Sequence, residues 1–225
     1  MPGADLGTAG PVAPSLGSVS SGGGHPVRVD PAPSPERARA ASWARLAELA
    51  ADCTACPFHL TRTQVVLFRG SRHPRVLFVG EAPGAEEDRR GVPFVGRAGR
   101  RLDDATEALD LRPEEWAVIN LVKCRPPGNR FVRRSAERCR PFLDRQIELL
   151  DPPWIVTLGR HALASLDPGA PPVTEAAGRE RRLEGRRLFP LLHPAAALHD
   201  PRLRARWASD LQRLRTALSL APETL

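Results

Sequence analysis

The chain's four cysteines have a spacing typical of a metal centre. Cys53 and Cys56 form a Cys-x2-Cys pair, and Cys124 and Cys139 follow after a long gap. Two cysteines three positions apart can present both sulfurs to one metal from a single turn. The alternatives are four unrelated thiols or two disulfides, and disulfides are not expected without a secretory signal. The spacing therefore predicts a four-thiolate centre, and it suits zinc and an iron–sulfur cluster equally.

Three other parts of the sequence carry polar groups directly after apolar runs. The stretch GEAPGAEEDRRGVPF at 80–94 crowds four carboxylates and two arginines before Phe94. Asn120 ends the run WAVIN, and His193 follows the run LFPLL. Each group also has a simpler interpretation, because the acidic stretch can be a solvated turn, Phe94 a core residue and His193 a turn residue before proline.

The apolar runs predict the elements that position these groups. Short runs rich in Val, Ile, Leu and Phe predict strands at 75–79, 116–122, 154–158 and 188–192. Helical spacing predicts helices at 36–50, 97–110, 135–150, 160–166 and 201–219. Continuous apolar strands that alternate with helices favour an α/β fold of three layers, α/β/α, with a central, mostly parallel four-stranded sheet. In such sheets ligands bind beyond the carboxyl ends of the strands, so the three polar sites should meet in one pocket there.

Composition limits the other possibilities. Residues 1–35 are rich in Gly, Pro, Ser and Ala without a helical or strand period, which predicts a disordered tail before one domain at 36–225. No apolar run is long enough to span a membrane, and the N-terminal stretch does not resemble a signal peptide. We therefore expect a cytoplasmic protein, and we separately predict that it is monomeric and associated with the nucleoid.

The basic residues favour a polyanionic partner. The formal net charge is +7, and Lys123 is the only lysine. Several groups of arginines lie close to predicted loops, where their planar guanidinium groups suit phosphates. The simpler interpretation is a basic surface with no specific partner.

Taken together, the motifs resemble those of a known family. The stretches CTAC, GEAPGAEEDRRGVPFVGRAG, NLVKCRPPGNR, CRPFL and LLHPAA are similar, in this order, to the family 4 uracil-DNA glycosylases of the iron–sulfur type. The similarity runs from about residue 40 to residue 215. It implies a parallel sheet between helices and a [4Fe-4S] cluster on the four cysteines, and it is the reason to prefer that cluster to zinc.

The resemblance also implies roles for the polar groups. Phe94 would stack on a uracil flipped out of DNA, and Asn120 would pair with O4 and N3–H of that base. His193 would donate a hydrogen bond to O2 as negative charge develops on the leaving uracil. Glu81 or Glu87 would position the attacking water or stabilise the sugar cation.

Other residues would hold the DNA and the base. Ala82 stands where an aspartate positions water in another uracil-removing family, so it cannot do that work and is expected to contact the uracil from the GEAPG turn. Arg125 and Arg130 would contact phosphates, and Leu198 would enter the base stack as a wedge, although a contact at the start of a helix explains Leu198 equally well.

The leading hypothesis is therefore a monofunctional glycosylase that flips uracil out of DNA, hydrolyses its N-glycosidic bond and leaves an abasic site. The alternative is a non-catalytic iron–sulfur module that recognises DNA or damage, for which His193 would be dispensable. A phosphate-binding enzyme fits less well, because GEAPG lacks the Gly-Lys-Ser/Thr of a phosphate-gripping loop.

Overall fold

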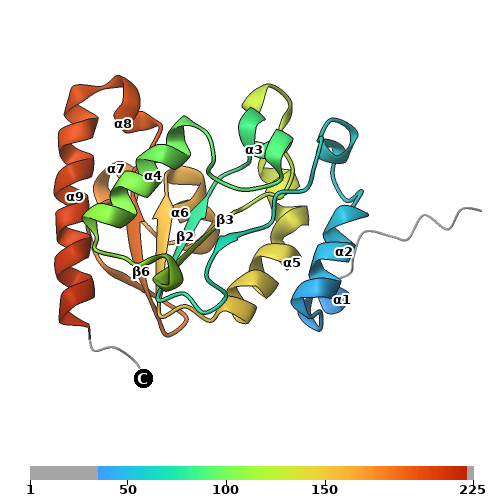
Figure 1. Cartoon of the computed structure of the whole chain (residues 1–225), viewed down its shortest axis with the longest axis horizontal. Helices are drawn as coiled ribbons and strands as arrows, with labels where there is room; N and C mark the ends of the chain where they lie inside the picture. Colours follow the sequence, from blue (N-terminus) through green and yellow to red (C-terminus); the bar gives the residue numbers. More distant parts are fainter. Residues whose placement is uncertain (1–34, 222–225) are drawn as a thin grey trace, which may run out of the picture. The chain divides into compact units, whose positions relative to one another are not determined.

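The apolar runs of the sequence pair into one sheet (Figure 1). The computed structural model describes residues 35–221. Within this range the sheet has the order β1-β3-β2-β4-β6-β5. Its strands are β1 (Arg69–Gly70), β2 (Val76–Gly80), β3 (Trp116–Asn120), β4 (Trp154–Leu158), β5 (Arg181–Leu183) and β6 (Arg186–Leu191).

The predicted α/β fold with a mostly parallel core is confirmed. The four predicted strands are β2, β3, β4 and β6, and they pair in parallel in the order β3-β2-β4-β6. The predicted number of strands was too small, because β1 and β5 add antiparallel edges. These two strands are only two and three residues long, and arginines form much of them, so neither has an apolar run by which it could be recognised.

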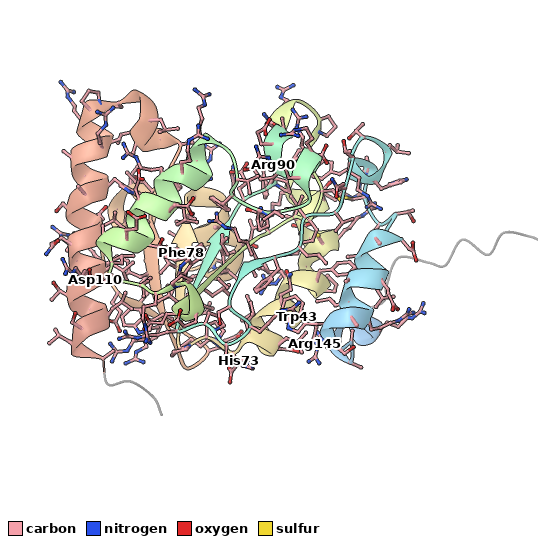
Figure 2. All side chains as sticks on the ribbon, in the orientation of Figure 1. Trp43, His73, Phe78, Arg90, Asp110 and Arg145 are labelled. Carbon is pink, nitrogen blue, oxygen red and sulfur yellow. The ribbon has the colours of Figure 1, made fainter. Side chains whose placement is uncertain are left out.

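Helices cover both faces of the sheet. One face packs against α4 (Arg97–Ala108) and α9 (Pro201–Leu220), and the other packs against α5 (Arg133–Leu150) and α6 (Arg160–Leu166) (Figure 1). Alternate residues of each strand serve the two faces, so Phe78 packs on the α4 side and its neighbour Leu77 on the α5 side. Phe78 is wholly buried inside the fold (Figure 2). Burial on both faces explains why the central strands β2, β3 and β4 are mostly apolar.

The helix predicted at 36–50 is two helices. The first, α1 (Pro35–Arg39), ends before Ser42, whose side chain accepts a hydrogen bond from the backbone N–H of Arg45 and begins α2 (Trp43–Ala51). Both helices pack on α5 through a small apolar cluster. The tail predicted at 1–35 lies, except for Pro35, outside the described residues.

The remaining elements are short and lie in the connections. They are α3 (Ala85–Arg90), α7 (Val173–Ala176), α8 (Ala196–His199) and the 3-10 turns η1 (Pro57–Leu60), η2 (Pro113–Glu115) and η3 (Pro127–Asn129). No helix among residues 35–221 is long and apolar enough to cross a membrane.

Candidate active site

The predicted polar sites meet in one pocket of about 590 Å³ at the carboxyl edge of the sheet. Its walls come from the turn after β2, from α3 and the segment after it, from the end of β3 and from the segment after β6. The predicted residues that line it are Glu81, Ala82, Glu87, Phe94, Asn120, His193 and Leu198. The structure thus brings together side chains that lie more than 100 positions apart in the sequence.

Phe94 and Asn120 lie against Gly80, the last residue of β2. A Cβ atom added to Gly80 would stand 2.5 Å from Asn120 Oδ1 and 2.5 Å from the Phe94 ring. The Phe94 ring is almost fully buried, and its centroid lies 6.2 Å from that of the His193 ring. Phe94 is therefore both a core residue, as the simpler interpretation held, and part of the pocket wall.

The backbone of Phe94 is strained and firmly held. Its φ is 55°, in the left-handed region that residues other than glycine rarely adopt. Arg69 donates a hydrogen bond of 2.7 Å to the Phe94 carbonyl and also pairs with Asp103 of α4. Gly99 packs so closely that a Cβ there would lie 2.0 Å from the same carbonyl oxygen. Strain that the surroundings enforce in this way is typical of functional sites.

Glu87 joins two segments of the pocket wall by hydrogen bonds. Its Oε2 accepts a hydrogen bond from the N–H of Gly84 (3.1 Å), and its Oε1 accepts from Val95 (2.9 Å) and Gly96 (2.8 Å). The carboxylate therefore ties the GEAPG turn to the segment that carries Phe94. The acidic stretch proves to be a helix rather than a turn, because Glu87 caps its start and Gly91, with φ of 71°, ends it.

Glu81 is the other carboxylate of the predicted pair. The backbone N–H groups that donate to Glu87 do not donate to Glu81. The Glu81 side chain lines the pocket and is about a third exposed. Burial raises the pKa of Glu81, and the charge of Arg160 lowers it in part. His161 Nε2 lies 3.9 Å from Glu81 Oε2.

Asn120 carries an unsatisfied acceptor. Its Oδ1 is buried and has no hydrogen-bond partner within residues 35–221. A buried polar atom without a partner costs about 1–3 kcal/mol, so the pocket is suited to a ligand that supplies a donor there.

His193 has one ring nitrogen engaged. The backbone N–H of Ala195 donates to His193 Nδ1 at 3.2 Å, which places the proton of the neutral ring on Nε2. Burial lowers the pKa of His193 to about 4, so the ring is neutral near pH 7. Gly159 packs against this residue, where a Cβ would stand 3.0 Å from His193 Cβ. The imidazole is thus a fixed, uncharged hydrogen-bond donor.

The predicted DNA contacts flank the pocket. Pro126 and Asn129 line it, and Arg125 and Arg130 adjoin these two residues in the loop after β3. Arg125 donates a hydrogen bond of 3.0 Å to Asn129 Oδ1. Leu198, on α8, reaches the rim from the side of His193.

Several other lining residues were not predicted individually, among them two with polar side chains. Arg97, at the start of α4, and Asn129, in η3, both line the pocket. Both lie inside stretches already recognised as motifs, FVGRAG and PPGNR, so the motifs carried a signal for them.

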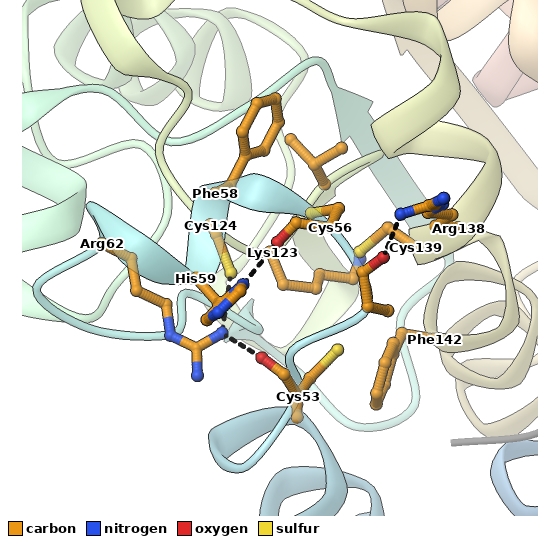
Figure 3. Close-up of a pocket in the computed structure, with 13 residues that line it drawn as sticks. Cys53, Cys56, Phe58, His59, Arg62, Lys123, Cys124, Arg138, Cys139 and Phe142 are labelled. Atoms are coloured by element: carbon orange, nitrogen blue, oxygen red, sulfur yellow. Dashed lines mark hydrogen bonds between the residues drawn. The ribbon is translucent and has the colours of Figure 1, made fainter. Parts of the chain in front are cut away.

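The four cysteines line a second cavity (Figure 3). They come from the segment after α2, the loop after β3 and α5, with Phe58 and Phe142 among the apolar neighbours. Burial raises the pKa of three of the thiols, that of Cys139 to about 12, so binding a metal must displace protons. Among the described residues, no three His, Cys, Asp or Glu side chains are placed to hold a single metal ion.

Two cationic side chains accompany these thiols. Arg62 donates a hydrogen bond of 3.2 Å to Cys124 Sγ, and the buried Lys123 lines the same cavity. Lys123 Nζ donates to the carbonyl of Asn120 at 2.5 Å. Four thiol donors, an N–H···S bond, nearby positive charge and an apolar shell suit an anionic, thiolate-ligated cluster.

Comparison with known proteins identifies relatives of the chain. Residues 68–214 match the family model of the uracil DNA glycosylase superfamily. A type-4 uracil-DNA glycosylase of Thermotoga maritima is 41% identical over 69% of this chain and 82% of its own. The enzyme of the same name from Sulfurisphaera tokodaii is 36% identical over 81% of this chain and 87% of its own. The one from Saccharolobus solfataricus is 38% identical over 80% of this chain and 88% of its own.

We expect Gly80→Ala to destabilise the protein by about 1–3 kcal/mol, because the added methyl group must displace the Asn120 amide and the Phe94 ring. Denaturant unfolding measures the difference. Gly169→Ala is the matched control, since its Cβ would make only an ordinary contact of 3.7 Å and should change stability by less than about 0.5 kcal/mol. Equal stability of the two variants would contradict the packing described above.

Proposed function

Because this chain belongs to the type-4 uracil-DNA glycosylases of the uracil DNA glycosylase superfamily, we propose that it removes uracil from DNA by hydrolysing the N-glycosidic bond and leaves an abasic site. The observation that carries the proposal is the convergence of an aromatic ring, a side-chain amide and an imidazole on one pocket. These are the groups needed to hold, read and activate a flipped base.

The flipped uracil stacks on Phe94 and pairs with Asn120. Stacking on an aromatic ring contributes about 1–3 kcal/mol per base, which offsets part of the cost of unstacking. The unsatisfied Asn120 Oδ1 accepts N3–H, and the amide N–H donates to O4. Cytosine presents an acceptor at N3 and an amine at C4, so it would leave polar atoms of the buried amide unpaired. Ala82 closes the pocket beside the base without offering a carboxylate.

His193 and Glu81 stabilise the two opposite charges that develop as the N-glycosidic bond breaks. The Nε2–H of neutral His193 donates to uracil O2, where negative charge accumulates as the bond breaks. Glu81 stabilises the sugar cation and orients the attacking water. Of the two carboxylates predicted for this role, Glu87 has both oxygens engaged by backbone N–H groups, so we assign it to positioning the GEAPG turn and Phe94.

The DNA lies across the carboxyl edge of the sheet. Arg125 and Arg130 contact phosphates on one side of the pocket, and Leu198 occupies the space left in the base stack from the other side. Phosphate contacts carry no sequence information, so binding should be independent of sequence and weaken steeply with salt.

The cysteines hold a [4Fe-4S] cluster. Cys53, Cys56, Cys124 and Cys139 are its ligands, and the cluster supplies a fixed cross-link between the N-terminal segment and the loop after β3. Lys123 and Arg62 balance its negative charge. Because Cys124 lies in the loop that carries Arg125 and Asn129, this cross-link keeps one wall of the uracil pocket in place.

The function is tested with a labelled oligonucleotide that contains one uracil. After incubation and treatment with alkali, we expect strand scission at uracil opposite guanine or adenine, and none in a matched oligonucleotide with thymine. His193→Ala should slow uracil release about 100-fold to 1000-fold through loss of the hydrogen bond to O2. Intact uracil-containing strands after incubation with folded, metal-loaded protein would refute the proposal, and full activity of His193→Ala would favour a non-catalytic role for this residue.

The dependence of kcat/KM on pH should identify the acidic group. Glu81 must be ionised, and burial raises its pKa, so the rate should fall as the pH drops through that pKa. His193, with a pKa of about 4, takes up a proton at lower pH than Glu81 and does not cause this fall. We therefore expect Glu81→Gln to abolish the acid limb and His193→Gln to retain it at a lower overall rate. The opposite pattern would show that the acid limb reports the ionisation of His193 and not that of Glu81.

Metal analysis and visible absorbance of anaerobically purified protein test the cofactor. We expect a broad visible absorbance and about four iron atoms per chain, with little zinc. Cys124→Ser should lose both the absorbance and the iron, whereas Ser135→Ala, in the nearby first turn of α5, should keep them. Stoichiometric zinc without visible absorbance would show that the thiols hold zinc instead.

A further inference from the structure

His161 lies next to Glu81 and belongs to a group of contacting side chains that do not line the pocket: Phe131, Arg160 and His161. The His161 ring stacks on Phe131, with centroids 4.1 Å apart and planes at 24°. Arg160 Nε donates a hydrogen bond of 3.1 Å to His161 Nε2. The same Nε2 atom is 3.9 Å from Glu81 Oε2. The group joins the loop after η3, the start of α6 and the turn after β2.

The hydrogen bond from Arg160 fixes what His161 can do. A ring nitrogen that accepts a hydrogen bond carries no proton, so the proton of the neutral ring lies on Nδ1. Burial and the charge of Arg160 lower the pKa of His161, which keeps the ring neutral near pH 7. His161 therefore cannot donate to Glu81 through Nε2, and any influence on the carboxylate passes through the guanidinium that it holds.

Two charged groups lie beside the His161 ring. Arg160, on its own helix, lowers the pKa of His161 by its charge, and Glu81, on the turn after β2, lies 3.9 Å from His161 Nε2, whereas Phe131 adds an uncharged surface. The charge of Arg160 favours the ionised form of Glu81, whereas burial opposes it. The guanidinium of Arg160 is therefore the positive charge that opposes the effect of burial on this carboxylate.

We propose that His161 is a positioning residue: clamped by the Phe131 ring, it holds the Arg160 guanidinium where its positive charge faces Glu81. The inference rests on the role proposed above for Glu81 and adds the residues that prepare it. Ionised Glu81 opposes the positive charge of the sugar at bond cleavage, so a misplaced Arg160 lowers the rate most at acidic pH.

Paired substitutions of His161 separate its two contacts. His161→Phe keeps a ring against Phe131 and removes the acceptor for Arg160, whereas His161→Gln keeps an acceptor near the Nε2 position and loses the ring. We expect the acid limb of kcat/KM on uracil-containing DNA to move to higher pH in His161→Phe and to stay closer to that of the wild type in His161→Gln. A move of half a unit to one unit lowers the rate about threefold to tenfold on the acid side.

Arg160→Gln completes the test. It should move the limb in the same direction, and the double variant His161→Phe, Arg160→Gln should show no further move, because both changes remove one interaction. Visible absorbance and thermal stability of each variant show that cluster and fold are retained. An unmoved limb in His161→Phe, or shifts that add in the double variant, would overturn the inference.

Glu81→Gln distinguishes failure of the inference from failure of the proposed function. If Glu81→Gln abolishes the limb while His161→Phe leaves it in place, the role of Glu81 stands and that of His161 is refuted. If Glu81→Gln keeps the wild-type rate and limb, the role of Glu81 is refuted and the inference falls with it. If the wild-type protein releases no uracil, the proposed function itself fails.

Discussion

Parallel pairing of the four central strands is the constraint on which the pocket depends. In the register of the sheet, Gly80 pairs with Asn120, and Leu158 pairs with Leu191, two residues before His193. This register places the GEAPG turn beside the amide and the imidazole on the same edge. A shift of one residue between β2 and β3 would turn the Asn120 side chain to the opposite face of the sheet. The backbone hydrogen bonds of the sheet therefore determine where the side chains of the site lie.

The two carboxylates near the pocket differ in what surrounds them. Both oxygens of Glu87 accept hydrogen bonds from backbone N–H groups, three in all, and the bonds from Val95 and Gly96 hold the strained backbone of Phe94 in place. Glu81 has no such bonds and lies at the pocket under the influence of a nearby guanidinium. An acid in a binding pocket is thus not by itself a reacting group. Its remaining hydrogen-bonding capacity indicates whether it can act on a ligand.

The sequence predicted the features that depend on local pattern. Continuous apolar runs located the parallel strands, and the rule that ligands bind beyond their carboxyl ends predicted that the GEAPG turn, Asn120 and His193 would share a pocket. The place of Phe94 in that pocket was predicted from the family resemblance. The rest depends on contacts between distant segments. The brace formed by Glu87, the hydrogen bond that sets the tautomer of His193 and the stack of Phe131 on another ring leave no periodic trace in the sequence. The edge strands were missed for a different reason, because short arginine-rich strands lack an apolar run.

The pocket at the carboxyl edge of the sheet and the thiol cavity are connected through Lys123. This lysine is 2% exposed, donates to the carbonyl of Asn120 and forms no ion pair with a carboxylate among the described residues. A buried cation is costly unless negative charge lies nearby, and the thiolates of the proposed cluster would supply that charge. The proposed cluster would then do more than fix a loop, because it would offset the burial of the ammonium group that holds the backbone of Asn120. In the proposed function, the binding of the cluster and the recognition of the base would therefore be coupled electrostatically.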